Sequence, residues 1–452
     1  MQFSHTGFRR LNDSVGIQLA LALIIAICLG IFIFLTALGV NAYWPVPAAI
    51  IYAGLFMLAM TLLIMRRRFD ALMLLAAAVC LCCGMYARVT MLSFQSSDYV
   101  YCLLPWTKKL GELPLKEALS TPIGDYNLPY LYFLTALSRT GWDELLHIKS
   151  LSCLFDVILA YIVMRLVALE VDDRRLELAA FLIVLISPTV MIDSAQWGQC
   201  DSIYVAFALL SVYAALKGRG RLCAISWTVA FTLKLQAVFI LPALAVALFM
   251  GRVRWRNLLW IPVVYVLSFL PALLAGRGLA NCVNIYGGQM GEYDKLWYNA
   301  PTVWRFLGAS RPEEYKLTAI FIALGALIIF TMLCLSLCSR MNSQQLFKLF
   351  FISSLLAPFL LPRMHERYFY MAEILSIVYF MYDRRKWYVP VAITLSSLTS
   401  YMRALIDNPS TIDGMYFSII FLVILGIETR ELFKELWHAT PDKLLYQADE
   451  AK

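Results

Sequence analysis

The stretch "GIQLALALIIAICLGIFIFLTALGV", residues 16–40, decides the fold class of this chain. It is an apolar run of full transmembrane length without a charged side chain. A bilayer core of about 30 Å is crossed by roughly 20 helical residues, so this run is long enough to span it. The basic pair Arg9–Arg10 precedes it, and we expect no small-residue cleavage site after it, so we expect a retained helix rather than a signal peptide.

Similar apolar runs recur from Gly16 to Ile427 of the 452-residue chain, which is 61% hydrophobic and 15% charged. Soluble domains average roughly 45–50% apolar and about 25% charged residues. The composition therefore predicts an all-α polytopic integral membrane protein, with one membrane domain over residues 1–452. The net charge of +8 does not indicate nucleic-acid binding, because Lys and Arg lie mainly in short clusters between apolar runs. The 11 Cys lie mostly in predicted helices, without metal-ligand or redox spacing.

The positions of the basic clusters predict the topology, because Lys and Arg in short loops stay on the cytoplasmic side. These clusters are Arg9–Arg10, Arg66–Arg68, Arg174–Arg175, Lys217–Arg221, Arg252–Arg256, Arg340 with Lys348, and Arg384–Lys386. The spans between them must then come in pairs. We expect about 13–14 transmembrane helices in a cell membrane, with both termini cytoplasmic and an N-terminal helical hairpin within residues 1–68.

Two apolar segments do not fit a simple series of spans. Residues 222–249 lie between two basic clusters, so we expect a hairpin whose two short halves meet near Lys234. Residues 128–137 are too short to span alone and are expected to be re-entrant. The predicted extracytoplasmic face then holds residues 93–127, 193–202, the break at Lys234, 276–316 and 362–368, with interfacial helices in its loops.

Two acidic stretches lie on this face. Asp98, in "FQSSDYVYCLLPW", directly follows a predicted span; it is either a solvated charge or a general base that takes a proton from a hydroxyl. In "AQWGQCDSIY", Gln199 and Asp201 are suited to hydrogen-bond a polyol. Alternatively, Asp201 caps the start of the following helix.

Basic residues also gather on this face, where positive charge is normally sparse. Lys234, in "TLKLQA", either snorkels to the interface or pairs with an anion such as phosphate. In "PRMHERYFY", Arg363, His365 and Arg367 offer a dense set of donors suited to phosphate, with Glu366 orienting Arg367. The alternative is a loop that neutralises its own charges.

Aromatic residues are frequent in "GEYDKLWYNAPTVWRFLG", residues 291–308. Tyr293, Trp297, Tyr298 and Trp304 present faces that can pack on sugar rings. The alternative is ordinary anchoring at the membrane interface, where Trp and Tyr are common.

Taken together, these stretches resemble the polytopic GT-C glycosyltransferases that use polyprenyl-phosphate sugars, above all the bacterial branch related to the eukaryotic GPI-anchor mannosyltransferases. The resemblance covers residues 93–385 and is carried by Asp98, "DYNLPYLYFLTAL" (125–137), "WGQCDSIY" (197–204), "LKLQAVFILP" (233–242), "WYNAPTVWRFLG" (297–308) and "MHERYF" (364–369). The chain has Asn127-Leu128-Pro129 where that family shows a proline pair, and its hairpin 16–65 lies upstream of the family's usual first span.

The resemblance implies a GT-C fold and an inverting transfer of a hexose, with mannose favoured, to a hydroxyl of a glycan, lipid or protein acceptor outside the cytoplasm. Asp98 would be the catalytic base, and His365, Arg367 and Lys234 would stabilise the departing polyprenyl phosphate. The substrate-binding residues would be Asp125, Gln199, Asp201, Lys234, Tyr298, Asn299, Trp304, Arg363, His365, Glu366 and Arg367. We expect no cofactor and see no clear metal-ligand cluster on this face.

Two other functions compete with this interpretation. A transporter or flippase of lipid-linked saccharides would place charges and broken helices near the bilayer midplane. A noncatalytic scaffold of envelope assembly would give Asp98 and the 363–367 cluster no purpose.

Overall fold

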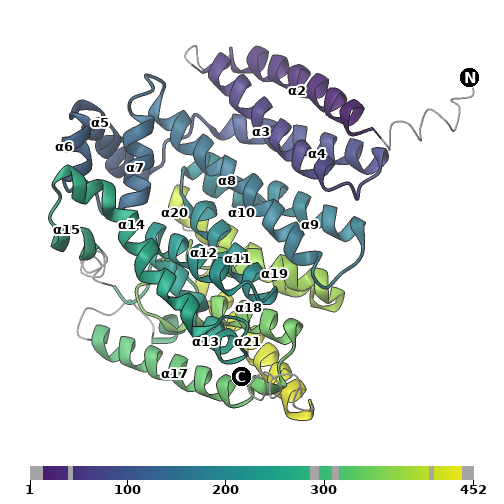
Figure 1. Cartoon of the computed structure of the whole chain (residues 1–452), viewed down its shortest axis with the longest axis vertical. Coiled ribbons are helices and arrows are strands. Elements are labelled where there is room, and N and C mark those ends of the chain that lie inside the picture. The colour runs from purple at the N-terminus through teal and green to yellow at the C-terminus, as the bar shows by residue number, and fades with distance from the viewer. Residues whose placement is uncertain (1–13, 39–43, 286–294, 308–314, 407–411, 440–452) are drawn as a thin grey trace, which may run out of the picture. The chain divides into compact units, whose positions relative to one another are not determined.

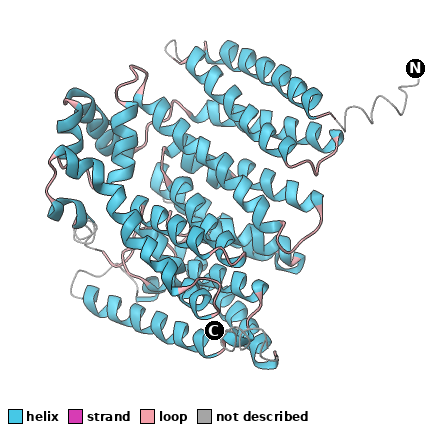
Figure 2. Ribbon diagram, in the orientation of Figure 1, coloured by secondary structure: helices cyan, strands magenta, loops and turns pink. Residues whose placement is uncertain are grey.

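The computed structural model describes residues 14–38, 44–285, 295–307, 315–406 and 412–439, which form helices and no strands (Figures 1 and 2). Arg9–Arg10, Tyr293 and both termini lie outside these residues. The chain divides into two compact units. Unit 1 comprises residues 1–112 and 134–203, and unit 2 comprises residues 113–133 and 204–452. The all-α prediction is confirmed for the described residues.

The helices of unit 1 include four long apolar helices, α2, α3, α4 and α8, and several shorter segments. They are α2 (Val15–Ala37), α3 (Pro45–Met65), α4 (Ala71–Met91), η1 (Tyr99–Leu103), α5 (Leu104–Glu112), α8 (Glu144–Val167), α9 (Arg174–Ile186), α10 (Pro188–Met191) and η2 (Ile192–Trp197). Helix α3 packs against α2, α4 and α8, and α8 packs against α9. The N-terminal hairpin expected within residues 1–68 is formed by α2 and α3.

The two ends of unit 1 differ in chemistry. At one end, Arg66 pairs with Glu177 at 3.1 Å, and Arg174 pairs with Asp70 at 3.1 Å. At the other end of α4 and α9 lie the loop that carries Asp98 and the corner that carries Trp197. The predicted topology requires this grouping of the basic loops. Which end faces the cytoplasm stays a prediction.

A buried ion pair joins the helices of unit 1 near the middle of α8. Arg88 of α4 donates to Asp156 of α8 from Nη2 at 2.9 Å and from Nε at 3.2 Å. Ser194 donates to the same carboxylate oxygen at 2.6 Å, and Arg88 also donates to the carbonyl of Leu185 at 2.8 Å. Buried charges are tolerated in an apolar interior only when they are paired and hydrogen-bonded in this way.

Unit 2 contains shorter and more often broken helices. They are α6 (Leu115–Ser120), α11 (Asp201–Leu216), α12 (Gly220–Leu233), η3 (Leu235–Ile240), α13 (Leu241–Phe249), η4 (Trp255–Leu259), α14 (Trp260–Ala275), α15 (Leu279–Val283), η5 (Val303–Leu307), α17 (Lys316–Ser336), η7 (Cys338–Arg340), α18 (Ser343–Leu360), α19 (Tyr370–Tyr382), η8 (Arg384–Lys386), α20 (Tyr388–Ile406) and α21 (Gly414–His438). Helix α7 (Leu128–Leu137) crosses the boundary between the units, and so does α11, whose residues Asp201–Ile203 belong to unit 1.

The basic clusters of unit 2 also meet at one end. Arg252 donates to Ser343 at 3.1 Å, and Arg340 donates to the carbonyl of Trp437 at 3.3 Å. Lys386 binds Glu428 at 2.9 Å. The hairpin expected between the clusters at 217–221 and 252–256 is present. Its arms are α12 and the η3–α13 segment, and they meet at Lys234 as expected.

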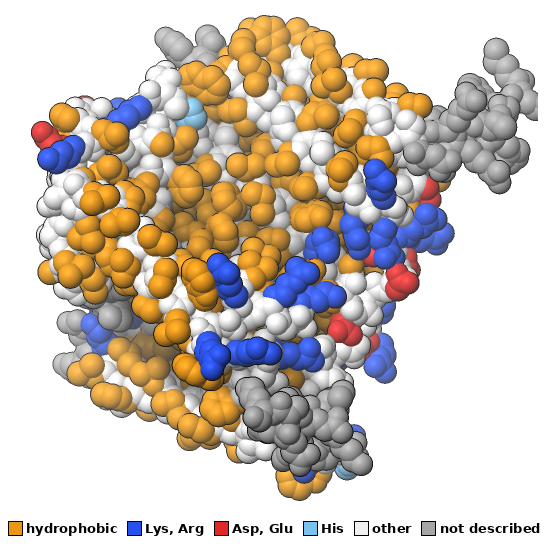
Figure 3. Space-filling view, in the orientation of Figure 1, with side chains coloured by type: hydrophobic (Ala, Val, Ile, Leu, Met, Phe, Trp, Pro, Cys, Tyr) orange, Lys and Arg blue, Asp and Glu red, His pale blue; other side chains and the backbone are white. Residues whose placement is uncertain are grey.

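Fewer helices have the length and composition of a membrane span than the 13–14 expected from the sequence. Eight helices of the described residues are long and apolar enough to cross a membrane, or nine if α9 and the α10–η2 segment, bent by 43°, count as one. Five further apolar helices have 10–17 residues. Hydrophobic side chains cover much of the visible surface (Figure 3). These features are those of a multi-pass membrane protein. The expected 13–14 spans stay a prediction.

Candidate functional site

The carboxylate of Asp98 lies in unit 1 between two donors from the "WGQ" corner. Oδ2 accepts a hydrogen bond from Trp197 Nε1 at 3.0 Å and from Gln199 Nε2 at 2.6 Å. Both donors are buried, whereas Asp98 is half-buried. The geometry brings two separate sequence motifs together around one partly accessible carboxylate. Gln199 is therefore in place to orient Asp98, and its expected role in binding a hydroxyl stays a prediction.

Unusual backbone geometry surrounds Asp98. It directly precedes the π-helical segment η1, and Trp197 ends a second π-helical segment, η2. Segments of π-helix are rare and occur frequently at functional sites. Ser96 links the two segments, because its Oγ donates to the carbonyl of Trp197 at 3.0 Å and accepts from the Tyr99 amide at 3.2 Å.

Lys149 of α8 fixes the loop that leads to Asp98. Its fully buried ammonium donates to the carbonyls of Met91, Leu92 and Phe94 at 3.2, 2.9 and 2.6 Å. These carbonyls belong to the end of α4 and the residues after it, which the helix itself leaves unsatisfied. Gly198 packs on the same side chain and has a φ of 79°, a conformation in which Gly is strongly favoured.

Asp201 is the first residue of α11 and is buried. Its acidic group therefore lies in the first turn of a helix, where a negative charge is favourable. This position agrees with the structural alternative of a helix start and leaves a role in substrate binding untested.

A second group of expected residues lines one cavity of about 410 Å³ in unit 2. Asp125, Lys234, Arg363 and Arg367 all contribute to its wall. Further polar lining comes from Tyr126, Gln236, Lys316 and Tyr368, and apolar lining from Leu235, Phe239, Ile320, Leu324 and Leu361. We call it the Lys234 cavity. It combines several cations with a hydrophobic wall.

Lys234 enters this cavity from the break between α12 and η3. Its backbone is extended, with φ −145° and ψ 139°, so it interrupts the helix. Its Nζ lies 5.8 Å from the ring centre of Tyr126 and 5.9 Å from that of Tyr204. A cation at this distance from an aromatic face is stabilised by the ring. Helix α12 has 14 residues and is thus about 21 Å long, less than a bilayer core of about 30 Å.

The 362–368 loop is held in place by the segment before η5. The amide of Arg363 donates to the carbonyl of Leu296 at 2.7 Å, and that of Tyr298 donates to the carbonyl of Met364 at 3.0 Å. These bonds hold Arg363 at a φ of 64°. A non-glycine residue in this region costs energy and is often found at ligand-binding sites.

Glu366 and His365 of this loop each have a defined neighbour. Oε1 of Glu366 lies 3.8 Å from Nε of Arg367, which is consistent with the expected orienting role. His365 stacks on Tyr298, with 4.8 Å between ring centres. Burial, followed by the charges of Arg367 and Lys234, lowers the pKa of His365 to about 3. At neutral pH His365 is thus a neutral hydrogen-bonding group, not the cation that the sequence suggested.

The remaining aromatic and amide residues support the loop. Trp304 donates from Nε1 to the carbonyl of Leu360 at 2.8 Å, at the end of α18. Asn299 has a φ of 51°, and its carbonyl accepts from Ser400 at 3.2 Å. Neither Trp304 nor Asn299 is among the residues that line the Lys234 cavity. Their contacts indicate a structural contribution.

Sequence reasoning missed several residues around these sites. Lys149 was part of an expected span, and only the carbonyls around it reveal its role. Tyr126, Gln236 and Lys316 line the Lys234 cavity although Lys316 is distant in the sequence from the motifs. Tyr126 could have been predicted as a site residue from the sequence, because it lies beside Asp125 in a motif already singled out.

In comparisons with known proteins, no family model and no curated protein matches this chain. The family resemblance therefore rests on the motifs alone.

Proposed function

We propose that this protein is a membrane glycosyltransferase that takes a hexose from a polyprenyl-phosphate donor and transfers it to an acceptor hydroxyl, with inversion. The donor has two parts that need different surroundings: a phosphate that requires cations and an isoprenoid chain that requires an apolar surface. Mannose is favoured by the motif resemblance only.

The observation that carries this proposal is the mixed wall of the Lys234 cavity. The wall offers cationic donors from Lys234, Arg363 and Arg367. Arginine suits phosphate because its planar guanidinium can donate two parallel hydrogen bonds. Ile320 and Leu324 follow Lys316 at intervals of four residues and so form an apolar stripe on one side of α17. The cations would bind the donor phosphate and stabilise the charge that develops on it during transfer. His365 is not among the residues that line the cavity, so the phosphate contacts are assigned to the three cations.

In this proposal Asp98 is the general base. Trp197 and Gln199 hold Oδ2 of Asp98 in place, and the carboxylate is half-buried, so it is positioned to take the proton of the acceptor hydroxyl. The acceptor oxygen then forms the new bond to the anomeric carbon as the bond to the phosphate oxygen breaks. The protein would thus supply a proton acceptor and cations for the leaving group.

One observation favours a second candidate, a transporter or flippase of lipid-linked sugars. The arms of the α12–α13 hairpin are short, so their break at Lys234 lies within the thickness of a bilayer. Broken helices that carry a charge at such a depth are typical of transporters.

A single assay separates the two functions. Purified protein in detergent is given a panel of polyprenyl-phosphate hexoses with an acceptor mixture, and release of free polyprenyl phosphate is measured. The glycosyltransferase proposal expects release from at least one donor. If no donor releases polyprenyl phosphate while proteoliposomes move the intact lipid across the membrane, the protein is a transporter.

Variants of Arg367 test the cavity within the same assay. A charge-assisted hydrogen bond to phosphate contributes about 1.5–3 kcal/mol, so Arg367→Ala should lower donor use roughly 10- to 150-fold. Arg367→Lys should restore it only in part, because an ammonium lacks the planar fork. Arg385→Ala is the matched control, since Arg385 is exposed at the opposite, basic end of unit 2. Unchanged donor use by Arg367→Ala would exclude this cation from the site.

A further inference from the structure

The basic end of unit 2 contains the same short motif twice. Gly218-Arg219-Gly220-Arg221 follows α11, and Gly251-Arg252-Val253-Arg254 follows α13. Gly218 and Gly251 have φ values of 66° and 72°. In both turns the next amide bonds back to a carbonyl five residues earlier, from Arg219 to Ala214 at 2.8 Å and from Arg252 to Ala247 at 3.0 Å. This is the Schellman geometry that ends helices.

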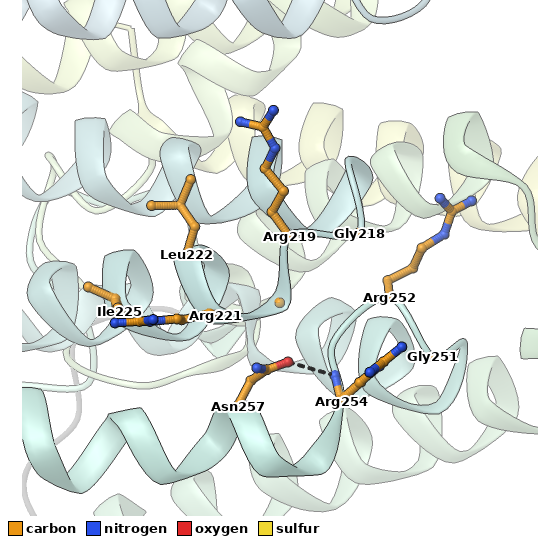
Figure 4. Close-up of a pocket in the computed structure, with 10 residues that line it drawn as sticks. Gly218, Arg219, Arg221, Leu222, Ile225, Gly251, Arg252, Arg254 and Asn257 are labelled. Carbon is orange, nitrogen blue, oxygen red and sulfur yellow. Dashed lines mark hydrogen bonds between the residues drawn. The ribbon is translucent and has the colours of Figure 1, made fainter. Parts of the chain in front are cut away.

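The two turns line one cavity of about 590 Å³, which also includes Leu222, Ile225 and Asn257. We call it the arginine cavity; Figure 4 shows Arg219 and Arg252 extending to the same side of it. Arg252 is held in position, because it donates to the carbonyl of Leu216 at 3.3 Å and to Ser343 at 3.1 Å. Arg221 lies over the ring of Trp260 at 4.1 Å.

The arginine cavity differs from the other basic clusters in its charge balance. Elsewhere in the described residues Arg66 pairs with Glu177, Arg385 pairs with Asp383, and Lys386 pairs with Glu431. By contrast, no carboxylate of the described residues forms an ion pair with the four arginines of this cavity. Among the residues that the structure describes, positive charge is therefore concentrated here without a paired carboxylate, and such a concentration of charge attracts anions.

The surface next to the cavity is apolar and exposed. Trp255, which directly follows the second motif, is 67% exposed, and Leu259, four residues later, is 63% exposed. They lead into α14, and only 11% of the apolar segment Trp255–Ala275 is buried within the protein. A ligand here would thus meet cations at one end and a lipid-facing helix at the other.

We propose that the arginine cavity binds the phosphate of an anionic phospholipid whose acyl chains lie along α14. Basic pockets between membrane helices recognise such headgroups, and each Lys or Arg near the headgroup strengthens binding about fivefold. This site lies at the opposite end of unit 2 from the Lys234 cavity, and the proposal does not depend on the transferase function.

The test measures lipid binding to the purified full-length protein by native mass spectrometry. Phosphatidylglycerol is titrated into detergent-solubilised protein and compared with phosphatidylcholine, and inorganic phosphate is added as a competitor. We expect the anionic lipid to bind more tightly than phosphatidylcholine and to resist displacement by phosphate. Arg219→Gln combined with Arg254→Gln should weaken its binding roughly 30-fold. Both side chains are exposed, and unchanged phosphatidylcholine binding reports that the variant is folded.

The matched control is Arg384→Gln combined with Arg385→Gln, which removes the same charge from another cluster of the same end. It should leave the affinity within about twofold of the wild type. An equal loss in the control would overturn the proposal in favour of general surface attraction. Displacement of the lipid by inorganic phosphate would overturn the lipid assignment, and so would equal affinities for the two lipids.

Discussion

Replacing Asp98 tests the proposed base and its surroundings at once. Asp98→Asn keeps the size of the side chain and one oxygen that can accept from Trp197 and Gln199. Asp98→Ala removes that oxygen and leaves the buried amide of Gln199 and the buried indole of Trp197 without this acceptor. The two variants therefore differ in structure but share the loss of the proton acceptor.

The structure gives a magnitude for each effect. A hydrogen bond to a charged group contributes about 1.5–3 kcal/mol. Asp98 accepts two and is half-buried, so Asp98→Ala should cost about 3 kcal/mol of unfolding free energy, near the lower limit for two. Asp98→Asn should cost about 2 kcal/mol, the difference of roughly 1 kcal/mol between a charged and a neutral bond taken for both bonds. Loss of a general base lowers turnover roughly 10²- to 10⁴-fold in both.

Two assays read these effects separately. Thermal unfolding in detergent should rank the wild type above Asp98→Asn and Asp98→Asn above Asp98→Ala. Release of polyprenyl phosphate should be equally low in both variants. Near-normal turnover by a folded Asp98→Asn protein would refute the role of Asp98 as base, and Asp201 and Asp125 would be tested next. Equal stability of the two variants would refute the hydrogen-bonded arrangement.

Three further predictions follow from the same structure. Lys149→Met removes three hydrogen bonds to carbonyls and should clearly lower the unfolding temperature. Lys217→Met, at an exposed position, is the control and should not lower it. Equal unfolding temperatures of the two variants would show that these bonds do not stabilise the loop. Because the pKa of His365 is depressed in the folded state, its contribution to stability is present above pH 6.5 and is lost as the pH falls toward about 3. His365→Gln should therefore lose less stability than the wild type over this pH range, as measured by thermal unfolding at a series of pH values. Single cysteines at positions 97 and 365 of a cysteine-free variant should react with an impermeant thiol reagent in intact cells, and labelling only after permeabilisation would reverse the assigned topology.

The sequence predicted those features that depend on local pattern. Lys234 interrupts a long apolar run between two basic clusters, and the break between α12 and η3 occurs there. The apolar run after the basic pair Arg174–Arg175 is interrupted at Pro188, and the helix bends there by 43°. A proline in an apolar run removes one backbone donor, which weakens the helix without changing its hydropathy.

The rest depends on contacts between distant residues. Lys149 was not singled out from the sequence, because its three carbonyl partners lie 55 to 58 residues earlier in the chain. The π-helical segments η1 and η2, which contribute to the surroundings of Asp98, have no sequence signature. His365 and Arg367 were expected to act together with Lys234; Arg367 and Lys234 line one cavity, whereas His365 is not among its lining residues. Asn299 and Trp304 came from the same motif, yet their observed contacts support the backbone.

The Arg88–Asp156 pair has a consequence for how the chain enters a membrane. Ribosomes add about 5–20 residues per second, and Asp156 lies 68 residues after Arg88. Helix α4 is therefore synthesised roughly 3–14 s before its counter-ion. An unpaired arginine within a bilayer costs about 2.5–3.5 kcal/mol during insertion. This cost favours retention of α4 beside the insertion machinery until α8 is synthesised. The two helices would then enter the bilayer together as an ion pair.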